Sequence, residues 1–143
     1  MAVGLAVLAL RSLMTSEDRS LSARAEEAFA DGQFEQAKTL SRQALTAAPL
    51  DVRALRVLGW TADLAGDTRS ADQLMTLSGR ISRRDSDTQA WLFDRGLALG
   101  SFPNALKHAD AMLRRQPATS QSIFPTLTTI LQEELPDRLF SLE

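Results

Sequence analysis

Three short segments decide the fold: ADGQFEQA at residues 30–37, LAGDTRSA at residues 64–71 and ALGSFPNA at residues 98–105. Their glycines lie 34 residues apart, and an alanine follows each glycine by five residues. The same spacing continues twelve and seventeen residues after each glycine, at Ala44, Ser78 and Met112 and then at Pro49, Arg83 and Pro117. A fixed period of this length is typical of a helical solenoid, in which one supersecondary unit is copied and stacked.

The period predicts a helical hairpin in each unit. Glycine ends a helix at little cost because it tolerates the positive φ of a tight reversal. The alanine that follows lies one turn into a second helix, where a small side chain lets two antiparallel helices approach closely. A proline seventeen residues after the glycine cannot continue that second helix. We therefore expect helices over residues 18–31, 33–48, 52–65, 69–82, 85–99 and 101–115, with a further one over residues 123–135.

The repeated positions resemble the tetratricopeptide repeat (TPR). The pair Leu58-Gly59 matches the family's large and small residues before the turn, and Phe34 and Phe102 match its aromatic residue after the turn. The resemblance implies an all-α, right-handed solenoid of three hairpins, 18–50, 51–84 and 85–117, within a region spanning residues 16–117. The sequence departs from the family pattern at Arg24, Thr68 and Arg83, so the array is expected to be degenerate.

Composition excludes several classes of function. The chain has 16 basic residues and a formal charge of −2. This charge argues against a nucleic-acid-binding surface, which needs a concentrated positive field. The absence of cysteine excludes disulfides, thiolate catalysis and zinc–thiolate sites. This absence is compatible with the cytoplasm or the periplasm. The location therefore stays open between the cytoplasm and a membrane association through the N-terminal segment.

Catalytic chemistry is not expected. His108 is the single histidine, and it falls within a predicted helix, where a surface imidazole is the ordinary interpretation. The adjacent glutamates at 26–27 and 133–134 point about 100° apart on a helix, which does not suit shared acid–base work. No glycine-rich phosphate loop follows a strand. We therefore predict a protein that is not an enzyme and that uses no cofactor and no metal.

The candidate binding residues lie on the first helix of each hairpin. In the family this helix lines the concave groove, and the resemblance implies that the groove includes Glu26, Phe29, Arg53, Arg56, Trp60, Asp63 and Asp94. The four from the second hairpin share one helical face by spacing alone. Arginine beside an exposed tryptophan is typical of interaction hot spots.

These residues predict a non-catalytic scaffold or adaptor that binds a peptide or helical segment of a protein partner in the groove. We expect reversal of an exposed Arg56 to glutamate to leave stability nearly unchanged. The alternative is that Trp60 packs between neighbouring helices while the arginines are simply solvated.

Both ends of the sequence are apolar. Residues 1–15 are compatible with a packed half-repeat, with a membrane-proximal segment that contacts lipid through residues 1–14, or with the start of a truncated chain. Their run of about thirteen apolar residues is too short to span a bilayer, which needs about 20. Residues 118–143 are expected to form a capping helix region and to continue in a longer protein, because Leu139, Phe140 and Leu142 remain apolar. The second functional hypothesis is therefore a structural module whose apolar ends mediate homo-oligomerisation or docking to a membrane or another domain.

Overall fold

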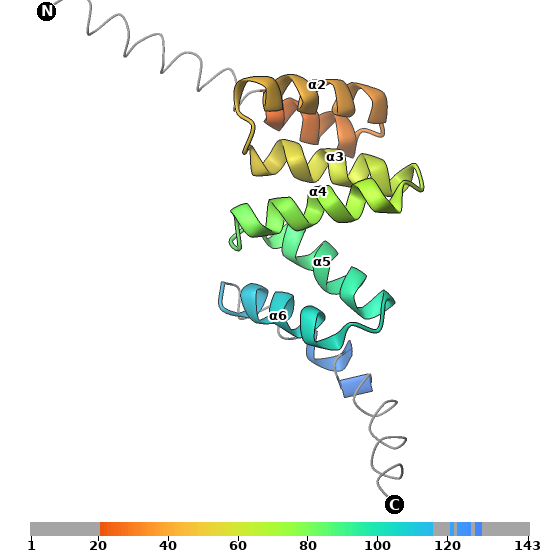
Figure 1. The fold of residues 1–143 in the computed structure, drawn as a ribbon, viewed down its shortest axis with the longest axis vertical. Helices are drawn as coiled ribbons and strands as arrows, with labels where there is room; N and C mark the ends of the chain where they lie inside the picture. Colours follow the sequence, from red (N-terminus) through yellow and green to blue (C-terminus); the bar gives the residue numbers. More distant parts are fainter. Residues whose placement is uncertain (1–20, 116–120, 122, 127, 130–143) are drawn as a thin grey trace, which may run out of the picture. The chain divides into compact units, whose positions relative to one another are not determined.

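The computed structural model describes residues 21–115, 121, 123–126 and 128–129, and within them it contains helices and turns but no strand. Residues 21–30 are helical. They are followed by α2 (Phe34–Ala47), α3 (Val52–Leu64), α4 (Thr68–Ile81), α5 (Ser86–Ala98) and α6 (Phe102–Leu113), and successive helices run back and forth (Figure 1). The predicted all-α arrangement of helical hairpins is confirmed. The predictions for residues 1–15 and for most of residues 118–143 lie outside the described residues.

The three repeated glycines form the same turn. Gly32, Gly66 and Gly100 have φ values of 76°, 77° and 64°, and no other described residue has a positive φ. In each case the glycine N–H bonds the carbonyl three residues earlier, and the next N–H bonds the carbonyl five residues earlier, as in Gln33 N to Ala28 O at 2.8 Å. This pair of bonds is the Schellman motif, which satisfies carbonyls at a helix end and requires a left-handed residue. The period in the sequence is therefore a period in backbone conformation.

The starts of the helices differ in how they are capped. The side chain of Asp51 accepts a bond of 3.1 Å from Ala54 N, and that of Asp67 accepts one of 3.1 Å from Ser70 N. Ser101 occupies the N-cap position of α6 but makes no such bond, and its hydroxyl accepts instead from Asn104 Nδ2 at 2.8 Å. Pro103 lies in the first turn of α6, where a missing N–H is tolerated.

The chain forms two compact units that divide within α5, after Thr88. In the first unit α3 packs on both α2 and α4. Its apolar core contains Ala25, Ala28, Ala37, Leu40 and Val57, with Leu21, Phe29 and Trp60 packed against it. Gly59 lets α4 approach α3, since a Cβ at this position would lie 2.6 Å from Met75 Sδ. The fully buried Ala71 lies on the same helix as Met75, in the register expected from the repeat.

The second unit is built from the remainder of α5, from α6 and from Ile123. Its core contains Phe93, Ala105, Ala109, Met112 and Ile123. A Cβ at Gly96 would lie 3.0 Å from the backbone nitrogen of Ala105, so these two helices touch through main chain. Nδ1 of His108 lies 2.7 Å from Oε1 of the buried Gln89, and the half-buried imidazole therefore belongs to the packing of this unit.

No helix among the described residues is both long enough and apolar enough to cross a membrane.

Candidate protein-interaction surface

Five of the seven predicted groove residues come together in the first unit. Glu26 and Phe29 belong to the helix at residues 21–30, whereas Arg53, Arg56 and Trp60 belong to α3. Arg53 Nε lies 3.2 Å from Glu26 Oε2, and Arg56 Nη2 pairs with Glu26 Oε1. The rings of Phe29 and Trp60 lie 5.1 Å apart. The first helices of two successive hairpins thus share one continuous face, which we call the inner face.

Arg56 is the centre of this face. Its guanidinium pairs with Glu26 on one side and with Asp85 on the other, and Asp87 Oδ2 lies 3.6 Å from Nη1. The same guanidinium lies over Trp60, with its central carbon 5.0 Å from the ring centroid. A buried cation needs opposite charges and hydrogen bonds to offset its lost hydration. Here carboxylates from two different segments supply them.

A chain of hydroxyls supports Asp85. Thr88 Oγ1 donates to Asp85 Oδ2 at 2.7 Å, and Ser78 Oγ lies 3.0 Å from Thr88 Oγ1. Each hydroxyl carries one hydrogen, so Ser78 is the donor to Thr88 once Thr88 has given its own to the carboxylate. The carbonyl of Val52, 3.3 Å from Ser78 Oγ, is then the weaker alternative acceptor. Buried hydroxyls on α4 and α5 therefore fix the carboxylate that holds Arg56.

The expectation that Arg56 is exposed is wrong. Its side chain is only 7% exposed, and its Nε has no hydrogen-bond partner. Arg53, by contrast, is 45% exposed while it remains paired with Glu26. Arg56 therefore acts on the inner face as an internal tie, and Arg53 is the arginine that solvent or a partner can reach. That either residue contacts a partner stays a prediction.

The aromatic residues form a ledge beside the arginines. Phe29 lies 5.4 Å from Phe34 and 5.1 Å from Trp60, measured between ring centroids. Trp60 is half-buried against the core, and Phe34 is 43% exposed. Tilted rings at these separations attract one another beyond their buried area. The ledge is held in place and partly open to solvent.

The other two predicted residues are Asp63 and Asp94. Asp63 is exposed near the end of α3. Asp94 lies on α5 in the second unit, where partial burial raises the pKa of its carboxyl above the ordinary value. The role of Asp63 and Asp94 as partner contacts also stays a prediction.

Sequence reasoning missed Asp85 and the hydroxyls that support it. Asp85 was expected only to begin a helix, and Ser78 only to be a small residue in the repeat register. Their buried partnership depends on the way α4 returns toward the start of α5, which no spacing rule encodes. The sequence carried no signal for the burial of Arg56, because Arg53, Trp60 and Asp63 on the same helical face are exposed or only half-buried.

The surface combines charged side chains of both signs with aromatic rings. Two arginines face three carboxylates, and the ledge adds apolar area. Within the described residues no group of three or more histidine, aspartate or glutamate side chains is arranged to hold a metal ion.

Comparison with known proteins supports the fold. No family model matches the chain, and no curated protein matches it. Among solved structures, a chain of the CopN–Scc3 complex is similar, with a TM-score of 0.54 at 12% sequence identity. The match covers 70% of this chain and 59% of that one, so this chain spans little more than half the length of its structural neighbour.

Proposed function

We propose that this chain is a non-catalytic protein-interaction module of the TPR type, and that the inner face of its first two hairpins binds a peptide or helical segment of a partner. The observation that carries the proposal is the half-buried Trp60, held between Phe29 and Arg56 and bordered by the exposed Arg53. Tryptophan and arginine in a fixed geometry are the residues that most often dominate binding energy at protein interfaces.

The TPR assignment is part of the proposal. It is supported by three Schellman turns at a 34-residue spacing and by the burial of Ala37, Ala71 and Ala105, each 0% exposed, five residues after the turn glycine. The structurally similar chain belongs to the CopN–Scc3 complex, which is compatible with an interaction role.

The mechanism we propose is recognition by a preformed surface. Arg56 ties together residues 21–30, α3 and the start of α5, so the face is ordered before any partner arrives. A surface that is already ordered loses little conformational entropy on binding. Arg53 and the partly exposed Glu26 offer charges of both signs at its edge, and the aromatic ledge offers apolar area.

Affinity capture tests this proposal. The full chain is used as bait beside the double variant Arg53→Glu/Trp60→Ala, with Arg80→Glu on the exposed end of α4 as the matched control. Circular dichroism first verifies that the three baits remain helical. We expect a partner that the wild type and Arg80→Glu retain and that the double variant loses. Equal retention by all three baits would rule out the inner face as the binding site.

A further inference from the structure

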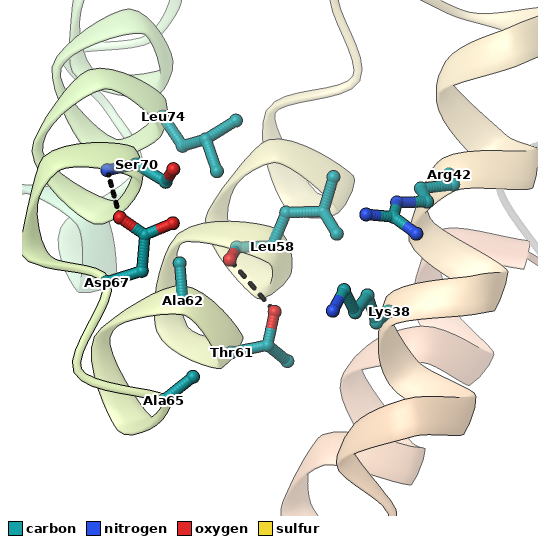
Figure 2. A pocket seen from close by; sticks show the side chains of 9 residues that line it. All are labelled: Lys38, Arg42, Leu58, Thr61, Ala62, Ala65, Asp67, Ser70 and Leu74. Carbon is teal, nitrogen blue, oxygen red and sulfur yellow. Dashed lines mark hydrogen bonds between the residues drawn. The ribbon is translucent and has the colours of Figure 1, made fainter.

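A cleft on the first unit repeats with the period of the sequence. It has a volume of about 240 Å³ and lies where α2, α3 and α4 meet (Figure 2). From α3 and α4 its walls take Leu58, Thr61, Ala62, Ala65, Asp67, Ser70 and Leu74. A second cleft, of about 190 Å³, is lined by the seven residues that lie 34 positions earlier, from Arg24 to Leu40. The geometry of the first two hairpins therefore creates the same kind of cleft in each of them.

The cleft between α2 and α4 has two lining residues in addition to the seven positions that it shares with its counterpart, and both are cations. Lys38 and Arg42 come from α2 of the preceding hairpin, and Figure 2 shows both reaching toward Leu58 and Thr61. The positions 34 residues earlier are Gly4 and Leu8, and those 34 residues later are Asp72 and Thr76. The basic pair is thus specific to this one cleft and is not a consequence of the repeat.

The other polar groups of the cleft are already engaged. Thr61 Oγ1 donates to the carbonyl of Leu58 at 2.9 Å, and Asp67 Oδ1 accepts from Ser70 N at 3.1 Å. In the part of the chain that the structure describes, neither Lys38 nor Arg42 forms an ion pair. Two cations on successive turns of one helix repel each other, so an anion between them would relieve that repulsion.

The apolar lining and the size narrow the class of occupant. Leu58, Ala62 and Leu74 give the same cleft an apolar wall. A free inorganic anion would make no use of this wall. The volume is below the 300–1,000 Å³ or so of a typical small-molecule site, and it suits one or two side chains.

We propose that this cleft is a second binding site, distinct from the inner face, which takes an acidic segment of a protein. A carboxylate of that segment lies between Lys38 and Arg42, and a neighbouring apolar side chain lies against Leu58 and Leu74. Asp67, on the opposite wall, disfavours a second carboxylate there and so sets the direction of the segment. This site does not include Trp60, so an experiment can disprove it without disproving the proposed function, and the reverse also holds.

A fluorescein-labelled eight-residue peptide of alternating glutamate and leucine is the probe. Its affinity for the full chain is measured by fluorescence anisotropy, and its position is mapped by amide chemical shifts in the ¹⁵N-labelled protein. The test variant is Lys38→Glu/Arg42→Glu. The matched control is Arg80→Glu/Lys107→Glu, which changes the net charge equally at exposed positions outside the cleft. Trp60→Ala serves as an inner-face control.

We expect the test variant to lose about tenfold or more in affinity, whereas both controls stay within about twofold of the wild type. The largest shifts should fall on the amides of Thr61, Ala65 and Ser70. A peptide of alternating glutamine and leucine should bind at least about tenfold more weakly. The proposal is overturned if wild-type protein does not bind the acidic peptide, if both charge reversals weaken it equally, or if inorganic phosphate at matched concentration displaces it.

Discussion

Each of the two units brings two successive helices into close contact, but different residues make the contact in each unit. In the first unit a glycine at position 59 admits the side chain of Met75, and a buried polar cluster around Arg56 joins the helices. In the second unit the residue 34 positions after Gly59 is Phe93, and it is buried in an apolar core. The close approach has moved by about one turn, to Gly96, where it meets the main chain of Ala105.

The difference shows what the repeat fixes and what it leaves free. The turn glycines and the buried alanines after them are the same in both units. The place where the paired helices touch is set by whichever small residue lies opposite the second helix. A large side chain such as Phe93 can therefore occupy the position equivalent to Gly59, provided that a glycine about one turn away lets the two helices approach each other.

Breaking the Arg56 cluster should have the largest effect. Arg56→Glu places a fourth carboxylate among Glu26, Asp85 and Asp87 and leaves the network without its cation, so we expect a loss of about 3–5 kcal/mol in the free energy of unfolding. Urea denaturation measures it. Arg53→Glu is the control and should cost less than about 1 kcal/mol, because its side chain is 45% exposed. Equal losses in the two variants would show that Arg56 is not the tie that we describe.

The two helix contacts should respond differently to an added methyl group. Gly96→Ala places a Cβ against the backbone of Ala105, which can move only with its helix, and should cost about 1–3 kcal/mol. Gly59→Ala meets only the flexible side chain of Met75, so the additional change Met75→Ala should relieve the clash.

Unfolding of Gly59→Ala, Met75→Ala and the double variant measures this coupling. The double variant should be more stable than the sum of the two single losses predicts. Strict additivity would contradict the contact. For Gly96→Ala, no truncation of a side chain beyond Cβ should restore stability, since the obstacle is main chain.

Helix capping sharpens the comparison on a smaller scale. Asp51→Ala removes the acceptor of Ala54 N at the start of α3 and should cost about 1 kcal/mol. Ser101→Ala at the start of α6 should cost less, because this side chain makes no capping bond. Thermal unfolding of the two variants provides the check, and the reverse order would contradict the assigned caps.

The smallest expected effect is a pH dependence of opposite sign in the two units. Hydrogen bonds from Ser70, first from its side chain and then from its backbone, lower the pKa of Asp67 below 3.8. Asp67 therefore adds stability above pH 3.8, and this stability is lost as the pH falls through its folded pKa. Partial burial raises the pKa of Asp94 above 3.8, so its contribution falls as the pH rises from 3.8 through its folded pKa.

Unfolding at pH 3 and pH 7 separates the two cases. Relative to wild type, Asp67→Asn should be less stable at pH 7 and Asp94→Asn should be more stable, and both differences should shrink at pH 3. Matching signs at pH 7 would contradict one of the two assignments.

Much of the fold was predictable from the sequence, because its determinants are local. A glycine that requires positive φ and an alanine five residues later act within one or two turns of chain. The predicted bounds of α2, α3, α4, α5 and α6 differ from the observed ones by at most two residues. The site was predictable only in part. Spacing placed Arg53, Arg56 and Trp60 on one face, and the structure brings them together with Glu26 and Phe29.

Burial within that face was not predictable, because it depends on contacts between segments distant in sequence. Arg56 is buried since Asp85 reaches it from a segment 29 residues away, held there by Thr88 and Ser78. The cleft that holds Lys38 and Arg42 likewise needs three helices to be in place. A residue-by-residue transfer from a family pattern locates a surface but does not show which of its charges are already paired.

The most direct test of the account is the fluorescence of Trp60 during binding. The chain contains two tryptophans, so Trp91→Phe leaves Trp60 as the single reporter. A partner segment identified by capture, and itself free of tryptophan, is titrated into this variant, and binding heat is measured in parallel. We predict that Trp60 emission shifts to shorter wavelength and saturates with the same dissociation constant as the heat. Full-affinity binding with unchanged Trp60 emission would contradict the claim that the inner face is where this protein meets its partner.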